Sequence, residues 1–234
     1  MKTPFLLSLA FLFFYLPAEA QLTFGIKGSF TEAAQSIDGA KTPKIQGLGT
    51  TFSLYKKVNK FLEIGAEPGL VQRGNGQQII DDYYYYAPIT FCGFGCFVSS
   101  YYPTYSNTSG LKTTHLQVPA MARLSLPMAK GRLAIFGKIG GGPSWLASGI
   151  YESEVLDLNT YEIVPETRTF SFSDDEGLKR WEWGWYSGAG IGYQTGFGMI
   201  TFETEFYRSL TSMSTYTELR NRSTSYSLGF SVRL

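Results

Sequence analysis

Eight charged residues lie inside segments whose other residues alternate between apolar and small or polar types. They are Lys27, Glu63, Glu67, Arg123, Lys138, Glu203, Glu205 and Arg233. Four are basic and four are acidic, so each charge can find an opposite partner. Because an ion buried without a partner is costly, this balance predicts a paired network in the interior of the protein. Two roles for the network stay open: a plug that fills and stiffens the interior, or a path for protons or ions.

The chain has two cysteines, Cys92 and Cys96, and two of the three residues between them are glycines. An oxidising compartment favours a disulfide, and the flexible spacer lets the small ring close. A zinc site would need four ligands, and His115 is the one histidine that could join the two thiols. We therefore expect a structural disulfide between Cys92 and Cys96, and no metal or cofactor.

His115 follows Thr113 and Thr114, which places a base beside two hydroxyl groups. Nucleophilic catalysis needs such a pair, so a lipid hydrolase at the rim of a membrane protein is one alternative reading. The alternation of residues around His115 turns its side chain towards the polar interior face, where a lone histidine is more often structural. We expect no catalytic residues and no enzymatic activity.

The segment around the cysteines is rich in aromatic residues, among them Tyr83, Tyr84, Tyr85, Tyr86, Phe94, Tyr101 and Tyr102. This segment is too apolar for an ordinary solvated loop. It could extend the wall of a sheet as a hairpin. It could also bind a partner protein, because rigid rings give contact area at a small entropy cost. The two interpretations are compatible, and both stay open.

Eight segments with strict period-two alternation would position these residues: 22–30, 47–55, 61–72, 115–126, 132–146, 183–194, 199–210 and 223–234. Such alternation is typical of strands with two unlike faces. None of the eight apolar faces contains Asp, Glu, Lys or Arg, and the opposite faces are small and rich in glycine. A narrow barrel surrounded by lipid needs this arrangement. The predicted fold is all-β: an eight-stranded antiparallel up-and-down transmembrane β-barrel.

The connections between these segments alternate in length. Short ones at 56–60, 127–131 and 195–198 alternate with long ones at 31–46, 73–114, 147–182 and 211–222. In outer-membrane barrels the short turns are periplasmic and the long loops extracellular, so both ends of the barrel domain are expected in the periplasm. Eight strands enclose room for side chains only, which favours the plug over a narrow pore.

Residues 1–20 have the pattern of a secretory signal peptide. Lys2 precedes an apolar run over 5–16, and Ala18 and Ala20 form the small-residue cleavage pattern. The run is too short to span a bilayer as a helix, so residues 21–234 are expected to form the barrel domain. Because Lys and Arg number 20 against 19 Asp and Glu, no nucleic-acid surface is implied. The expected partners are outer-membrane lipid and the barrel assembly machinery, which typically reads an apolar terminal strand such as 226–234.

Five segments resemble the PorT-like outer-membrane β-barrel family, which is common in Bacteroidota. They are 21–30, 116–123, 135–145, 187–192 and 202–208, and they cover strands along the whole barrel domain. The resemblance implies a non-enzymatic outer-membrane protein that acts as an accessory or docking subunit of an envelope complex, with a secretion apparatus as the narrower version. Any envelope partner would bind through the long loops. The chain departs from the family in Glu205-Phe206-Tyr207-Arg208, where Arg-Tyr is usual, and in its large second loop.

Overall fold

The computed structural model describes residues 21–82, 106–157, 162–171, 177–215 and 217–234. These residues form twelve strands and one short 3-10 helix. The elements are β1 Leu22–Ile37, β2 Ala40–Lys41, β3 Ile45–Lys57, β4 Leu62–Ala66, β5 Gly69–Asp82, β6 Ser106–Gln117, β7 Ala120–Met128, η1 Ala129–Gly131, β8 Leu133–Asp157, β9 Glu162–Ser171, β10 Trp181–Gln194, β11 Met199–Ser209 and β12 Leu219–Arg233. Among the described residues, no helix is both long enough and apolar enough to cross a membrane.

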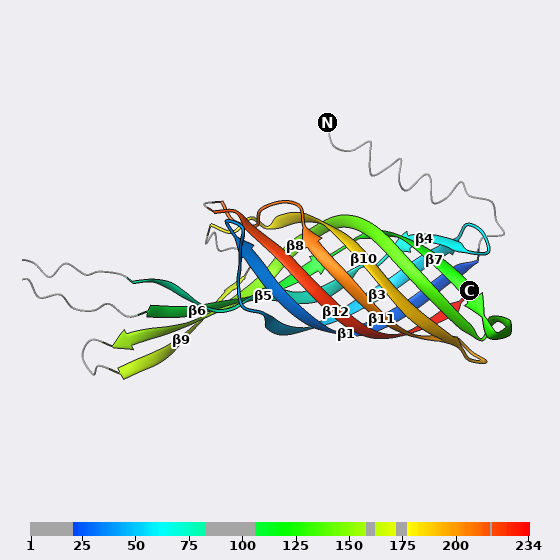
Figure 1. Cartoon of the computed structure of the whole chain (residues 1–234), viewed down its shortest axis with the longest axis horizontal. Helices are drawn as coiled ribbons and strands as arrows, with labels where there is room; N and C mark the ends of the chain where they lie inside the picture. Colours follow the sequence, from blue (N-terminus) through cyan, green and yellow to red (C-terminus); the bar gives the residue numbers. More distant parts are fainter. Residues whose placement is uncertain (1–20, 83–105, 158–161, 172–176, 216) are drawn as a thin grey trace, which may run out of the picture.

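The strands wind obliquely around a common axis and close on themselves (Figure 1). Every pairing between described strands is antiparallel, and the pairings run from β1 through β3, β4, β7, β8, β10, β11 and β12 back to β1. Further along the axis, β5 and β6 take the places of β4 and β7 between β3 and β8. The predicted all-β, antiparallel, up-and-down architecture is confirmed, but the described residues form twelve strands where the sequence predicted eight.

Two prolines account for part of this difference. Pro68 separates β4 from β5, and Pro119 separates β6 from β7. Proline has no N–H to donate, so a ladder that contains it is interrupted or bulged. The ladder is bridged locally, because Glu67 N–H donates to the Pro119 carbonyl (3.1 Å) and Phe52 N–H donates to the Pro68 carbonyl (2.8 Å). The predicted segments 61–72 and 115–126 each cross one of these breaks.

The hairpins β1–β2 and β8–β9 account for the remaining difference, because β2 and β9 are the two strands not yet explained. The described residues of the predicted loops 73–114 and 147–182 lie mostly in strands. β5 continues to Asp82, β6 begins at Ser106, and β8 continues to Asp157 and pairs with β9. The tiny β2 pairs with the end of β1. In Figure 1 the β5–β6 and β8–β9 hairpins project beyond the barrel at the end opposite to the C-terminus. The described parts of 73–114 and 147–182 are therefore largely strand extensions rather than loops.

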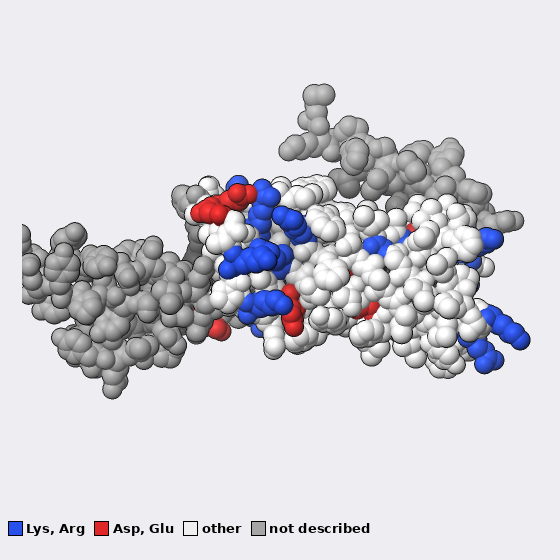
Figure 2. Space-filling view, in the orientation of Figure 1, with Lys and Arg blue, Asp and Glu red and all other residues white. Residues whose placement is uncertain are grey.

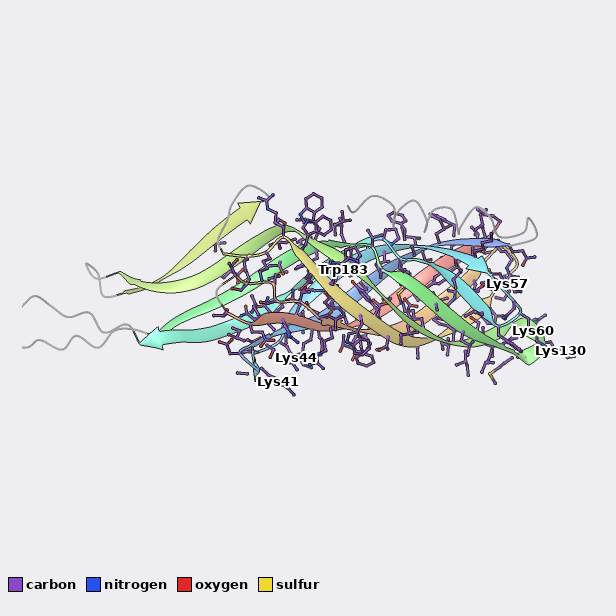
Figure 3. All side chains as sticks on the ribbon, turned by 90° about the horizontal axis from the view of Figure 1, so that it is seen from above. Lys41, Lys44, Lys57, Lys60, Lys130 and Trp183 are labelled. Atoms are coloured by element: carbon purple, nitrogen blue, oxygen red, sulfur yellow. The ribbon has the colours of Figure 1, made fainter. Side chains whose placement is uncertain are left out.

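The apolar faces of the eight predicted segments point outward, as expected. Leu48, Ile139 and Leu228 are each more than 60% exposed to the surroundings, although they belong to the most regular strands. So large a continuous apolar surface needs a lipid environment. Figure 2 shows a mostly uncharged wall, with Lys and Arg gathered mainly towards its two ends. Trp183, labelled in Figure 3, lies outward on β10 and is 56% exposed, in keeping with an aromatic girdle.

Candidate functional site

An ionic layer crosses the middle of the lumen, and we define it as Lys27, Glu67, Lys138, Glu203 and Glu205. Lys27 Nζ lies 2.7 Å from Glu67 Oε2 and 2.5 Å from Glu203 Oε1. Lys138 Nζ lies 2.9 Å from both of these oxygens and 2.6 Å from Glu205 Oε2. Two carboxylates therefore each bridge both lysines, and the layer ties together β1, β8, β11 and the junction between β4 and β5.

Glycines on neighbouring strands make room for these long side chains. Lys27 lies opposite Gly229 in the ladder, and a Cβ at Gly229 would stand 2.7 Å from Lys27 Cγ. Glu203 lies opposite Gly190, where a Cβ would stand 2.8 Å from Glu203 Cβ. Real side chains do not approach so closely. The glycine-rich inner face noted in the sequence is thus the space that the ionic layer fills.

The ionic layer contains one carboxylate more than it has lysines. The Tyr55 hydroxyl donates a 2.6 Å hydrogen bond to Glu67 Oε1, which gives that carboxylate a third donor. Carboxylate oxygens of Glu67, Glu203 and Glu205 lie within 4.8 Å of one another, a spacing that a metal ion could bridge. The amino groups of Lys27 and Lys138 already occupy the positions between them. The arrangement is therefore suited to internal neutralisation by lysine rather than to holding a metal.

A second ion pair lies nearer the short turns. Arg123 Nε donates to Glu63 Oε2 at 2.6 Å, and both side chains are at most 10% exposed. The Arg123 guanidinium also lies over the Tyr55 ring, 4.2 Å from its centroid. Arg233 does not take the interior place predicted for it. It lies exposed at the last position of β12, at the open end of the lumen rather than within it.

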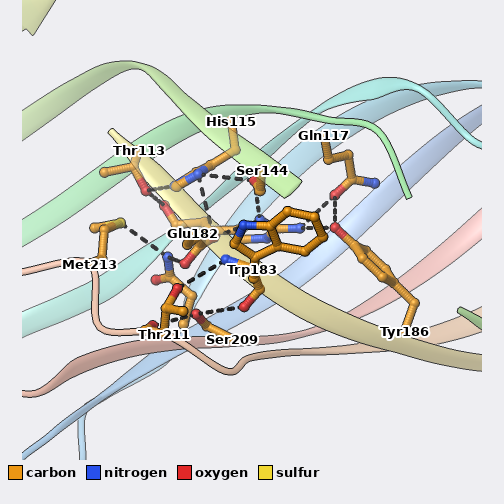
Figure 4. Close-up of polar contacts among 12 residues, drawn as sticks. Thr113, His115, Gln117, Ser144, Glu182, Trp183, Tyr186, Ser209, Thr211 and Met213 are labelled. Carbon is orange, nitrogen blue, oxygen red and sulfur yellow. Dashed lines mark hydrogen bonds and ion pairs between the residues drawn. The ribbon is translucent and has the colours of Figure 1, made fainter. Parts of the chain in front are cut away.

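Towards the long connections lies a polar layer that the sequence analysis missed. Its centre is Arg73 on β5, which is 1% exposed. Arg73 Nη1 donates to Glu182 Oε1 and to Ser144 Oγ, both at 3.0 Å, and its Nη2 donates to Gln117 Oε1 at 2.5 Å. Figure 4 labels these three partners, Glu182, Ser144 and Gln117. The guanidinium lies 3.6 Å from the centroid of the Tyr207 ring. These contacts join β5, β6, β8, β10 and β11.

His115 belongs to this polar layer. Its Nε2 lies 2.9 Å from Thr113 Oγ1, and its Nδ1 lies 3.5 Å from Glu182 Oε1. This hydroxyl, imidazole and carboxylate could in principle form a nucleophilic site. Thr113 and His115 are 0% exposed, however, and the Thr113 hydroxyl donates to the Arg73 carbonyl at 3.1 Å. The hydroxyl is thus committed to the main chain, and a substrate has no access to it.

Arg73 and Glu182 escaped prediction because they lie just outside the segments taken as strands. The alternation continues past the predicted limits: Val71 and Arg73 both point inward, as do Glu182 and Tyr186. Extending each strand until its parity fails would have included both charges. The available signal was a basic residue, Arg73, and an acidic residue, Glu182, each directly next to the end of a predicted strand.

Several predicted residues lie outside the described parts of the chain. They are Cys92, Cys96, Tyr83, Tyr84, Tyr85, Tyr86, Phe94, Tyr101 and Tyr102. The disulfide and the partner-binding loop therefore stay predictions.

The closed antiparallel wall, its apolar outer face and its ion-filled lumen agree with a comparison against protein families. Residues 16–215 match the model of the outer membrane protein beta-barrel domain. The chain belongs to this family. As a member of it, the protein is placed in the bacterial outer membrane.

Several solved structures resemble this chain at a distance. The attachment invasion locus protein Ail of Yersinia pestis is 10% identical, covers 90% of this chain and 99% of its own, and has a TM-score of 0.39. Neisserial surface protein A is 13% identical. The match covers 90% of this chain and 97% of that protein, with a TM-score of 0.42. The N-terminal β-barrel domain of OprF from Pseudomonas aeruginosa is 9% identical. The match covers 91% of this chain and 99% of that domain, with a TM-score of 0.31. Among curated proteins, no sequence matches this chain. The structural likenesses are distant, and nothing about this chain's role follows from them.

Proposed function

We propose that this protein is a non-enzymatic, non-conducting outer-membrane barrel that presents its long connections outside the cell and docks another envelope protein there. The closed, filled lumen acts as a rigid base for those connections. The motifs that resemble the PorT-like family of Bacteroidota favour an accessory subunit of an envelope complex, and a secretion apparatus is the narrower version. Export by cleavage of residues 1–20 belongs to the same proposal.

The observation that carries the proposal is the inaccessibility of the lumen side chains. Arg73, His115, Glu182 and Tyr186 are each at most 1% exposed. A lumen that conducted ions would have to bring such charged and polar groups into contact with water. The same burial argues against a hydrolase at His115, because catalysis needs a substrate within reach of the nucleophile.

The pairing and length of the strands support an eight-stranded wall and a hairpin that projects beyond it. With β4 and β5 counted as one interrupted strand, and β6 and β7 as another, the ring of pairings is that of an eight-stranded barrel. β8 is 25 residues long, whereas a tilted membrane strand needs about 9–11. The surplus continues into the β8–β9 hairpin, which therefore stands well clear of the lipid and is available to a partner.

Two measurements on the full chain, the first with purified protein and the second with outer membranes, test the lumen and the docking role separately. In planar bilayers, the wild type should give only baseline current, and a steady current would contradict the filled lumen. Outer membranes with an affinity-tagged chain should yield a reproducible envelope protein. A variant with a shortened β8–β9 hairpin should still run as a heat-modifiable barrel but should lose that protein. Unchanged copurification would remove the hairpin from the docking surface.

The orientation has its own test. Protease added to intact cells should cut within the long connections and spare the turn at 56–60. Cleavage at 56–60 before the membrane is opened would reverse the proposed topology.

A further inference from the structure

A cavity of about 460 Å³ opens at the short-turn end of the barrel, below the Arg123–Glu63 pair. The turn between β3 and β4, the turn between β7 and β8, and the ends of β10 and β12 surround it. Its volume falls in the range of about 300–1,000 Å³ that is usual for ligand-binding sites. Lys57, Lys60 and Lys130 are labelled at this end in Figure 3, on the side opposite to Lys41 and Lys44.

The charges around this cavity are strongly unbalanced. Five of its lining residues are basic, and one, Glu63, is acidic. Glu63 is bound by Arg123. The other basic residues of the lining are Lys57, Lys60, Arg132 and Arg233.

Within the part of the chain that the structure describes, none of these four cations has a carboxylate at ion-pair distance. Lys60 instead lies over the Phe61 ring, 4.8 Å from its centroid. A concave wall lined with charges of one sign focuses the field into the cavity.

We propose that this short-turn mouth binds an acidic polypeptide segment of another envelope protein. The four cations come from three separate places on the rim: Lys57 and Lys60 from the β3–β4 turn, Arg132 from the β7–β8 turn, and Arg233 from the end of β12. A ligand that engages them together must carry several negative charges spaced along its length. Consecutive Asp or Glu side chains on an extended peptide meet that requirement.

Other anions fit this mouth less well. A single phosphate is bound best by guanidinium groups that converge as a fork, whereas two of these four cations are lysines. A membrane lipid would have to bring its headgroup inside the rim, although its acyl chains belong against the apolar outer wall. The inward position of the cavity, among residues such as Ser125 and Ala134, therefore favours a soluble segment that enters from the aqueous side.

This inference does not depend on the docking role proposed for the long connections, because the two surfaces lie at opposite ends of the barrel. It can be tested with the purified full chain in uncharged detergent, using fluorescence anisotropy of a labelled hexaglutamate peptide. Binding should be absent for the matching hexaglutamine peptide and should weaken as salt rises. Each cation removed should weaken binding about 1.4- to 5-fold, the range for exposed ion pairs.

The decisive comparison uses two double variants of equal charge. Lys57→Gln with Lys60→Gln should lower the affinity for hexaglutamate, whereas Lys41→Gln with Lys44→Gln, at the opposite end, should leave it unchanged. Heat-modifiable migration confirms that both variants fold. Equal affinities for the two variants, or no binding at low salt, would overturn the proposal.

Two further measurements separate other anions from the peptide. Inorganic phosphate that displaces hexaglutamate at the same concentration as an unlabelled peptide would assign the mouth to small anions instead. Peptide binding that disappears only in nanodiscs of phosphatidylglycerol would assign it to lipid headgroups. Competition by unlabelled hexaglutamate alone supports the proposal.

Discussion

The stability of the barrel should depend more on Lys138 than on any single carboxylate of the ionic layer. Lys138 contacts three carboxylates, and its side chain is 0% exposed. In the variant Lys138→Met, Glu67 and Glu203 would keep Lys27, whereas Glu205 would lose the one lysine that it contacts in the layer. Removing one partner of a buried ion pair typically costs about 3–5 kcal/mol, and we expect a loss of that size in the free energy of unfolding.

Removing a carboxylate instead of a lysine tests whether the balance of charges in the ionic layer sets its stability. Glu203→Gln leaves Glu67 and Glu205 with Lys27 and Lys138, which is a balanced set. It should therefore cost less than Lys138→Met, although it removes two contacts. The double variant restores the charge difference of the wild type and should be more stable than Lys138→Met alone. Groups in one ionic network typically couple by about 0.5–3 kcal/mol.

Urea unfolding in detergent or lipid, followed by tryptophan fluorescence, measures these differences as shifts of the midpoint at a constant slope. Lys44→Met is the matched control, because Lys44 forms an exposed pair with Glu32 at 2.9 Å, and its midpoint should stay with the wild type. If Lys138→Met loses less than about 1 kcal/mol, the size of an exposed pair, the layer is not a stabilising network. A double variant that is no more stable than Lys138→Met would refute the charge count.

Two other predictions concern single positions. Mass spectrometry of the unreduced protein should show Cys92 joined to Cys96, and thiols that alkylate readily without reductant would reject the pairing. Gly184→Ala should lower stability by about 1–3 kcal/mol through overpacking, since a Cβ there would overlap the edge of the buried Tyr207 ring. Gly28→Ala meets nothing within 4 Å and should leave the urea midpoint unchanged, so equal losses at the two glycines would contradict this packing argument.

Alternation in the sequence was enough to predict which side of each strand faces outward, and therefore that Lys27, Glu67, Lys138 and Glu203 point into the lumen. Both follow from a period of two residues, which is a local property. The strand count could not be predicted in the same way, because proline interrupts a ladder without changing which side the neighbouring residues face. Arg233 keeps the inward parity of its strand but lies exposed at the open end of the lumen. Parity gives direction, whereas depth along the axis depends on how the strands are staggered.

The ionic layer also bears on how the strands find their stagger. A strand that slips by two residues against its neighbour still turns every apolar side chain to the lipid, because only an odd slip exchanges the faces. Contact with lipid therefore hardly distinguishes the correct register from one that is shifted by two residues, a displacement of about 6.6 Å. The ion pairs of the layer do depend on register, because their members come from strands that are not adjacent and meet within 3 Å. These members are Lys27, Glu67, Lys138 and Glu203. A misaligned barrel would carry unpaired ions in its lumen, and that penalty selects one shear number for the wall during assembly.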